Sequence, residues 1–130
     1  MIVLDASVVV EVLANGALAG SIRSELAANE EPVIVPHLLD VEAVSAIRRL
    51  VGAQRVDSHH IGQILTGLAS LPAECYSHTP LIDRIWELRH NFTQYDAAYI
   101  ALAEATNSVL YTCDEKLRRG HRARVVVFAS

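Results

Sequence analysis

Short runs of apolar residues alternate along this chain with longer segments in which apolar residues recur every three or four positions. A short apolar run that stops at a polar residue is typical of a buried parallel strand, because both faces of such a strand are covered. Val33-Ile34-Val35, which Pro36 follows, is one example. The pattern predicts strands at residues 2–4, 33–35, 75–77, 109–113 and 125–128.

The segments between these strands have the apolar periodicity of helices, and several carry end signals. Asn15-Gly16 ends the first helix, Pro36 fits the first turn of a later one, and Thr79-Pro80 supplies an N-cap and an N1 proline. We expect helices at about residues 7–14, 18–28, 38–51, 58–70, 80–89 and 95–105, with a short helical turn after residue 114.

Alternation of strands and helices predicts a parallel sheet with right-handed crossovers. The expected fold class is therefore α/β, a three-layer sandwich with helices on both faces of the sheet. The length of 130 residues suits one domain covering residues 1–130, and a hydrophobic share of 52% is enough for a sizeable core. Trp86 is expected to pack into this core from its helix, and the Cys113 thiol to be buried in it.

Two acidic residues, Asp5 and Asp114, follow predicted strands directly. Open parallel sheets bind ligands at the carboxyl ends of their strands, near the point where the strand order reverses. Each Asp could equally cap the turn after its strand, which is a common role for this residue. Two such residues in one small sheet keep a functional site open as an alternative.

Two further acids lie on helix faces that are otherwise mostly apolar. Glu42 has Leu38 and Leu39 as helical neighbours, and either an ion pair with Arg49 or a metal ion would compensate its burial. Asp96 lies in the first turn of the helix at 95–105, where the helix dipole alone also favours Asp. Four hard oxygen ligands at one edge of the sheet would suit Mg²⁺ or Mn²⁺.

The composition limits the possible binding partners and the location of the protein. A net charge of −4 is unusual for a nucleic-acid binder, but five of the eleven Lys and Arg residues lie within residues 116–124 and give one local basic edge. Cys75 and Cys113 have no disulfide or metal-knuckle spacing, and the start of the chain does not resemble a signal peptide. A cytoplasmic location without membrane contact is expected.

Four short motifs resemble those of the PIN-domain ribonucleases, most closely the VapC-type toxins of bacterial toxin–antitoxin pairs. They lie in order at residues 3–7, 36–42, 95–103 and 111–117, and the resemblance extends over nearly the whole chain. It implies a PIN-like fold in which Ser7 and Thr112 support the catalytic, metal-binding acids Asp5, Glu42, Asp96 and Asp114. One departure is Ser45, where many members of the family carry Asn.

What the resemblance implies is a Mg²⁺- or Mn²⁺-dependent endoribonuclease, a hydrolase that acts as the toxin of a type II pair. Its expected partners are an RNA substrate, a cognate antitoxin with a basic or amphipathic tail, and a second copy of the chain in a homodimer. Part of the apolar face around Trp86 is the alternative location for that dimer interface. Phosphatases and receiver domains also place Asp at strand ends. Both need additional acidic residues at set positions, and a receiver domain also needs a Lys on a late strand. This chain has none of these residues at the corresponding positions. A non-catalytic RNA- or protein-binding module on the same fold remains the alternative.

Overall fold

A computed structural model describes residues 1–129 and contains a five-stranded parallel sheet in the order β3-β2-β1-β4-β5. All five predicted strands are present, although Pro36 is the last residue of a strand and not part of the following helix. The strands are β1 (Ile2–Leu4), β2 (Val33–Pro36), β3 (Glu74–Tyr76), β4 (Val109–Thr112) and β5 (Arg124–Val127).

The helices lie where the periodicity predicts them, to within a residue or so at most ends. The segment predicted at 58–70 and the one predicted at 80–89 each begin with a 3₁₀ turn before the α-helix. The α-helices are α1 (Ala6–Leu13), α2 (Ala19–Asn29), α3 (Leu39–Gly52), α4 (Ile61–Ala69), α5 (Ile82–Glu87) and α6 (Gln94–Ala105). The 3₁₀ turns are η1 (Ser58–His60), η2 (Thr79–Leu81) and η3 (Glu115–Arg118).

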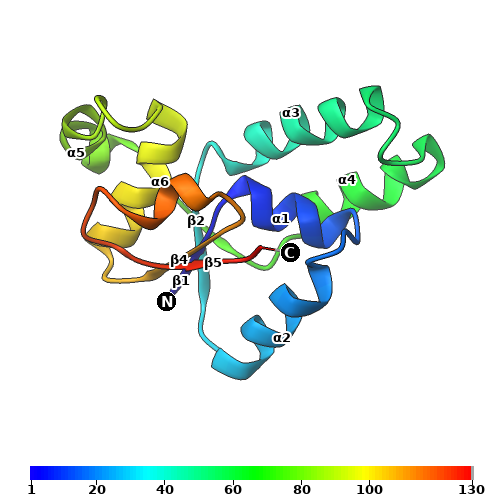
Figure 1. The fold of residues 1–130 in the computed structure, drawn as a ribbon, viewed down its shortest axis with the longest axis horizontal. Helices are drawn as coiled ribbons and strands as arrows, with labels where there is room; N and C mark the ends of the chain where they lie inside the picture. The colour runs from blue at the N-terminus through cyan, green and yellow to red at the C-terminus, as the bar shows by residue number, and fades with distance from the viewer. Residues whose placement is uncertain (130) are drawn as a thin grey trace.

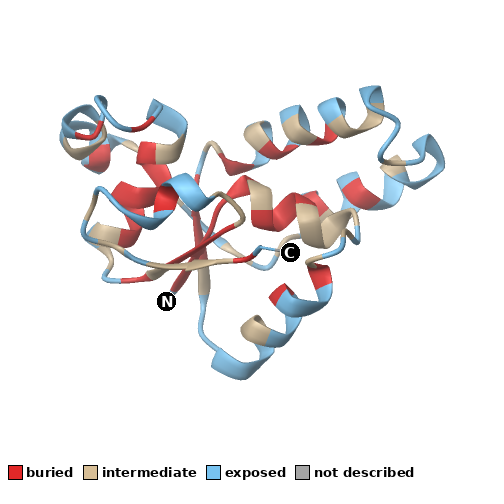
Figure 2. Ribbon diagram, in the orientation of Figure 1, coloured by how far each residue is buried: buried red, intermediate tan, exposed pale blue. Residues whose placement is uncertain are grey.

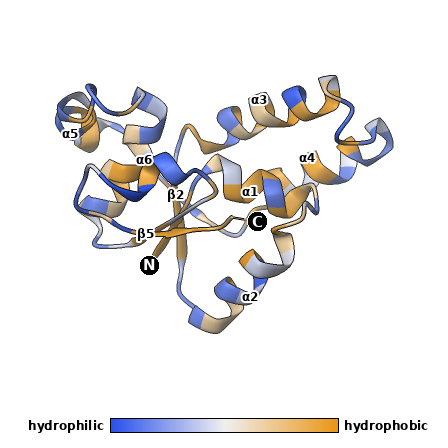
Figure 3. Cartoon of the chain, viewed as in Figure 1, coloured by the Kyte–Doolittle hydropathy of each residue, from blue (hydrophilic) through white to orange (hydrophobic). Residues whose placement is uncertain are grey.

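Helices cover both faces of the sheet, which confirms the three-layer α/β sandwich (Figure 1). On one face α6 packs against β1, β2 and β4, with α5 beyond it. On the other face α1 lies next to the sheet and carries α2, α3 and α4 around it. Helix α6 is buried from Ala97 to Ala103, as expected for a helix that is apolar almost all round (Figures 2 and 3).

The strand order reverses next to β1, at the centre of the sheet. From β1 the chain adds β2 and β3 on one side, and then β4 and β5 on the other. This strand pairs with β2 on one side and with β4 on the other, so that Val3 lies opposite both Ile34 and Leu110. The carboxyl ends of β1 and β4 therefore flank the switch point, where open α/β sheets bind their ligands. Asp5 directly follows β1, and Asp114 lies two residues beyond the end of β4.

Two predictions about packing are wrong. Trp86 is 65% exposed on α5, with the Arg89 guanidinium above its ring, so it does not belong to the core. Cys113 packs against the core but is only partly buried, because the chain leaves β4 at Thr112, one residue before it. Within residues 1–129 no helix is long and apolar enough to cross a bilayer.

Candidate metal centre

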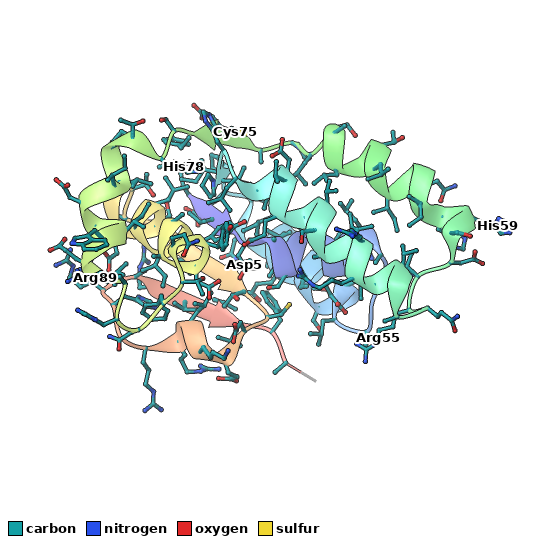
Figure 4. All side chains as sticks on the ribbon, turned by 90° about the horizontal axis from the view of Figure 1, so that it is seen from above. Asp5, Arg55, His59, Cys75, His78 and Arg89 are labelled. Atoms are coloured by element: carbon teal, nitrogen blue, oxygen red, sulfur yellow. The ribbon has the colours of Figure 1, made fainter. Side chains whose placement is uncertain are left out.

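Asp5 connects the end of β1 to the start of α1. Its carboxylate oxygen Oδ1 accepts a hydrogen bond from the backbone N–H of Val8 at 3.1 Å, so it is the N-cap of α1. The residue is 5% exposed, and this burial raises the pKa of its carboxyl group despite the hydrogen bonds that it accepts. Figure 4 places Asp5 near the middle of the molecule, between α3 and α6. The capping role is therefore real, and the same carboxylate also lines a cleft.

Two hydroxyl groups hold the Asp5 carboxylate in place. Ser7 Oγ donates to Oδ1 at 2.6 Å, and Thr112 Oγ1 donates to Oδ2 at 2.5 Å. The two hydroxyls are fixed in turn by backbone donors, because Cys113 N donates to Ser7 Oγ and Asp114 N donates to Thr112 Oγ1, each at 3.0 Å. The loop after β4 is thus tied to Asp5 through both of the predicted supporting residues.

Glu42 lies in the first turn of α3 and is half-buried. Its Oε1 accepts a hydrogen bond from the Tyr99 hydroxyl at 2.8 Å, and no ion pair with Arg49 forms within the described residues. Burial and the negative charges of Asp96 and Asp5 raise the pKa of the Glu42 carboxyl group. One carboxylate oxygen is therefore occupied, and no donor among the described residues reaches the other.

Asp96 and Asp114 face each other from the starts of two helical segments. Asp96 lies in the first turn of α6, where its backbone N–H is capped by Thr93 Oγ1 at 3.2 Å. Its carboxyl pKa is raised by burial and then by the charge of Asp114, which the charge of Lys116 only partly opposes. Asp114 caps η3 by accepting from the backbone N–H of Lys116 at 3.0 Å.

All four predicted acids line one cleft of about 510 Å³ at the switch point. They come from four segments that are far apart in the sequence, the ends of β1 and β4 and the starts of α3 and α6. The other lining residues are Ala6, Ser7, Leu38, Val41, Ser45, Ala46, Arg49 and Tyr95. Within residues 1–129, however, no three His, Cys, Asp or Glu side chains are placed closely enough to hold a metal ion by themselves.

This arrangement fits a hydrated divalent cation better than a closed protein cage. Mg²⁺ gives up its water reluctantly and is usually held by one or two carboxylates together with water and substrate phosphate oxygens. Three of the four carboxyl groups have raised pKa values, which means that burial and mutual repulsion disfavour their charged forms. A divalent cation in the cleft would offset both costs. The shared metal nevertheless stays a prediction.

Tyr99 is the contributor to this site that the sequence analysis missed. It lies on the expected buried face of α6 and is 0% exposed, which suggests a core aromatic and nothing more. A buried tyrosine hydroxyl needs a hydrogen-bonding partner, however, and that requirement is the signal that could have identified it. Its partner Glu42 is 57 positions away, so only the fold reveals the pair.

Comparisons with known proteins identify the family of this chain. The family model for the PIN domain matches residues 2–122. The VapC ribonuclease Mb0985 of Mycobacterium bovis is 41% identical over 117 residues, which cover 90% of this chain and 88% of the relative. Ribonuclease VapC12 of Mycobacterium tuberculosis is 35% identical over 131 residues, which cover 99% of this chain and all of the relative.

A solved structure shows the same fold at lower sequence identity. The crystal structure of VapBC2 from Rickettsia felis, bound to a DNA fragment from their promoter, contains a chain that matches with a TM-score of 0.71. That match has 16% sequence identity and covers 99% of this chain and 100% of the other. Together, the family model and the relatives identify the chain as a member of the PIN-domain family, within its VapC ribonucleases.

Proposed function

We propose that this chain is a divalent-metal-dependent endoribonuclease that hydrolyses RNA phosphodiester bonds as the toxin of a type II toxin–antitoxin pair. RNA cleavage follows from its membership of the VapC ribonucleases. The observation that carries the metal dependence is the single cleft at the switch point. Four carboxylates from separate segments line it: Asp5, Glu42, Asp96 and Asp114.

Mg²⁺ or Mn²⁺ bound there would lower the pKa of a water molecule and offset negative charge on the scissile phosphate. The protein would supply the oxygen ligands from the carboxylates that line the cleft. Ser7 and Thr112 keep Asp5 in one orientation, so little reorganisation is needed when substrate arrives. Tyr99 donates to one oxygen of Glu42, Oε1, and the Glu42 side chain lines the cleft. Either Glu42 or one of the aspartates can orient the attacking water.

We further propose that a cognate antitoxin covers the acidic cleft and that residues 1–130 form one domain in the cytoplasm. The family supports the antitoxin, since toxins of this class are paired with one. Two copies of the chain are expected to meet through the apolar side of α5, where Ile82 is 57% exposed and Trp86 is 65% exposed. Sedimentation velocity at several protein concentrations would measure this association.

The test of the nuclease is cleavage of end-labelled RNA by the purified chain with Mg²⁺, with Mn²⁺ and with EDTA. We expect cleavage only with a divalent ion, and we expect Asp5→Asn to remove it. Asp40→Asn is the matched control, because Asp40 is an exposed acid of α3 outside the cleft. If RNA binds equally well to the wild-type chain and to Asp5→Asn without being cut, the non-catalytic binding module is the better description.

A further inference from the structure

One wall of the cleft carries polar groups that the proposed metal centre does not use. Helix α3 presents Glu42, Ser45 and Arg49 to the cleft on a single face, since residues three and four apart lie next to each other on a helix. Seven residues of helix rise place Arg49 about 10 Å beyond Glu42 along the helix axis. The acidic end of the cleft therefore continues into a row of polar residues along α3. Helix α3 lies on the side of the molecule seen in Figure 4.

Arg49 is the only basic residue among the described residues that line the cleft. Its Nη1 donates to Ser45 Oγ at 3.1 Å, which directs the side chain along the helix face. Within residues 1–129 it forms no ion pair with a carboxylate, and it is exposed. The guanidinium keeps its remaining donors for an anion, and its planar geometry suits a phosphate.

Tyr95 lies on the opposite wall, next to Asp96 at the start of α6. Its side chain is 52% exposed and lines the cleft, so the ring is accessible to a bound molecule. An exposed ring in a nucleic-acid cleft provides a surface on which an unpaired base can stack. The cleft thus combines carboxylates for a metal, a cation for a phosphate and an aromatic ring for a base.

We propose that Arg49 and Tyr95 are the substrate-binding residues of this cleft. In this arrangement Tyr95 stacks on a base beside the scissile phosphate, and Arg49 pairs with a phosphate farther along the same RNA strand. The inference rests on the proposed nuclease function and deepens it. Four carboxylates would repel the RNA backbone, so a cation on the wall beyond them fixes which way the strand runs through the cleft.

The experiment measures binding and kinetics separately. Binding is followed by fluorescence anisotropy of a fluorescein-labelled, single-stranded 12-nucleotide RNA of mixed sequence in Mg²⁺, with every protein carrying Asp96→Asn to prevent cleavage. Arg49→Ala is compared with Arg48→Ala, a neighbouring exposed arginine of α3 outside the cleft. Tyr95→Ala is compared with Tyr95→Phe, which keeps the ring. The same four substitutions without Asp96→Asn give kcat and KM on a cleavable RNA.

We expect Arg49→Ala to weaken binding about tenfold and to flatten the slope of log Kd against log salt by about 0.7, the value for one phosphate contact with a single strand. Arg48→Ala should change neither quantity. Tyr95→Ala should weaken binding at least about fivefold with little change in the salt slope, and Tyr95→Phe should bind like wild type. In the cleavable background, the two Ala variants in the cleft should raise KM more than they lower kcat.

Two results separate failure of this inference from failure of the proposed function. If the wild-type chain cleaves RNA but Arg49→Ala behaves like Arg48→Ala, or Tyr95→Ala behaves like Tyr95→Phe, the assignment of that residue is wrong and the nuclease stands. If the wild-type chain cleaves no RNA with either metal, the proposed function fails and this inference fails with it.

Discussion

Replacing Thr112 by Val tests whether the hydroxyl groups around Asp5 stabilise its charged form. Valine keeps the shape of threonine in a position that is 0% exposed, so the change removes a donor without creating a large cavity. Oδ2 of Asp5 then loses the only donor that it has within residues 1–129, and Asp114 N loses its acceptor. Ser7→Ala is the natural comparison, because Cys113 N then loses its acceptor as Asp114 N does in Thr112→Val, whereas Oδ1 of Asp5 keeps the backbone N–H of Val8.

The structure sets the size of the two effects. A hydrogen bond to a charged group contributes about 1.5–3 kcal/mol, and a buried carboxylate that loses its donor bears most of that cost. We therefore expect Thr112→Val to lower the free energy of unfolding by about 2–3 kcal/mol at neutral pH without metal. Ser7→Ala should cost less, about 1–2 kcal/mol, because Oδ1 stays hydrogen-bonded to Val8 N although Cys113 N loses its acceptor. For a chain of this length, each kcal/mol corresponds to a shift in Tm of about 4 °C.

The pH dependence of stability shows whether the loss in Thr112→Val comes from the charge of Asp5. Burial raises the pKa of Asp5 in the folded apo protein, so the folded state binds more protons than the unfolded chain, and stability falls as pH rises from the unfolded pKa through the folded one. Loss of the Thr112 donor raises the folded pKa further. At about pH 4, close to the ordinary pKa of Asp, a raised pKa leaves more of the Asp5 carboxyl group protonated in both folded proteins than at pH 7, and the difference between them should shrink.

Urea unfolding followed by circular dichroism at about pH 4 and pH 7, in EDTA, measures both differences. The reasoning fails if Thr112→Val is equally destabilised at the two pH values, because its effect would then come from packing and not from the Asp5 charge. It also fails if Ser7→Ala costs more than Thr112→Val at pH 7. That order would mean that the Val8 N–H does not compensate for the lost serine hydroxyl.

Two further predictions concern metal binding. Free Mn²⁺ at about 100 times its dissociation constant should add about 2.7 kcal/mol to the stability of the wild-type chain, whereas Asp96→Asn, which should be at least as stable as wild type without metal, should gain less in the same thermal melts. An equal gain in both proteins would argue against a shared site. Tyr99→Phe should weaken Mn²⁺ binding about tenfold in calorimetry while the chain stays folded, because Glu42 loses the partner that orients it. Unchanged affinity would limit Tyr99 to packing.

The architecture could be predicted from the sequence because its signals are local. Each strand is a short run bounded by turn or cap residues, and helix α6 is apolar on every side, so neither depends on distant residues for its assignment. The local pattern could not show which apolar helix faces are covered by another segment of the chain. Trp86 has the spacing of a core residue, yet among the described residues its ring is covered only in part, with the Arg89 guanidinium above it, and it remains 65% exposed. The spacing of apolar residues shows which face of a helix is apolar, but not which segment packs against that face.

The residues of the candidate site could likewise be predicted only in part from the sequence. Asp5 and Asp114 could be singled out because strand ends in a parallel sheet meet at one edge, and the structure places both in the cleft there. Glu42 could be singled out as an acid on an apolar face, but the residue that compensates it could not. Arg49, one helical turn beyond Ser45, was the plausible partner by sequence, whereas the hydroxyl of Tyr99 is the actual one. Long-range hydrogen bonds of this kind leave no trace in spacing.

The acidity of the chain does not by itself argue against RNA binding, because four of its fifteen acids lie together in the cleft. The net charge of −4 equals the charge of the four ionised carboxylates in the cleft, so the rest of the chain is neutral in sum. An unscreened cluster of this kind would repel a phosphate backbone, and a divalent cation removes half of its charge. RNA affinity should therefore depend on metal before chemistry begins, with Arg49 on one wall adding the only positive charge that lines the cleft within the described residues. In this protein the metal is expected to recruit the substrate as well as to activate the water.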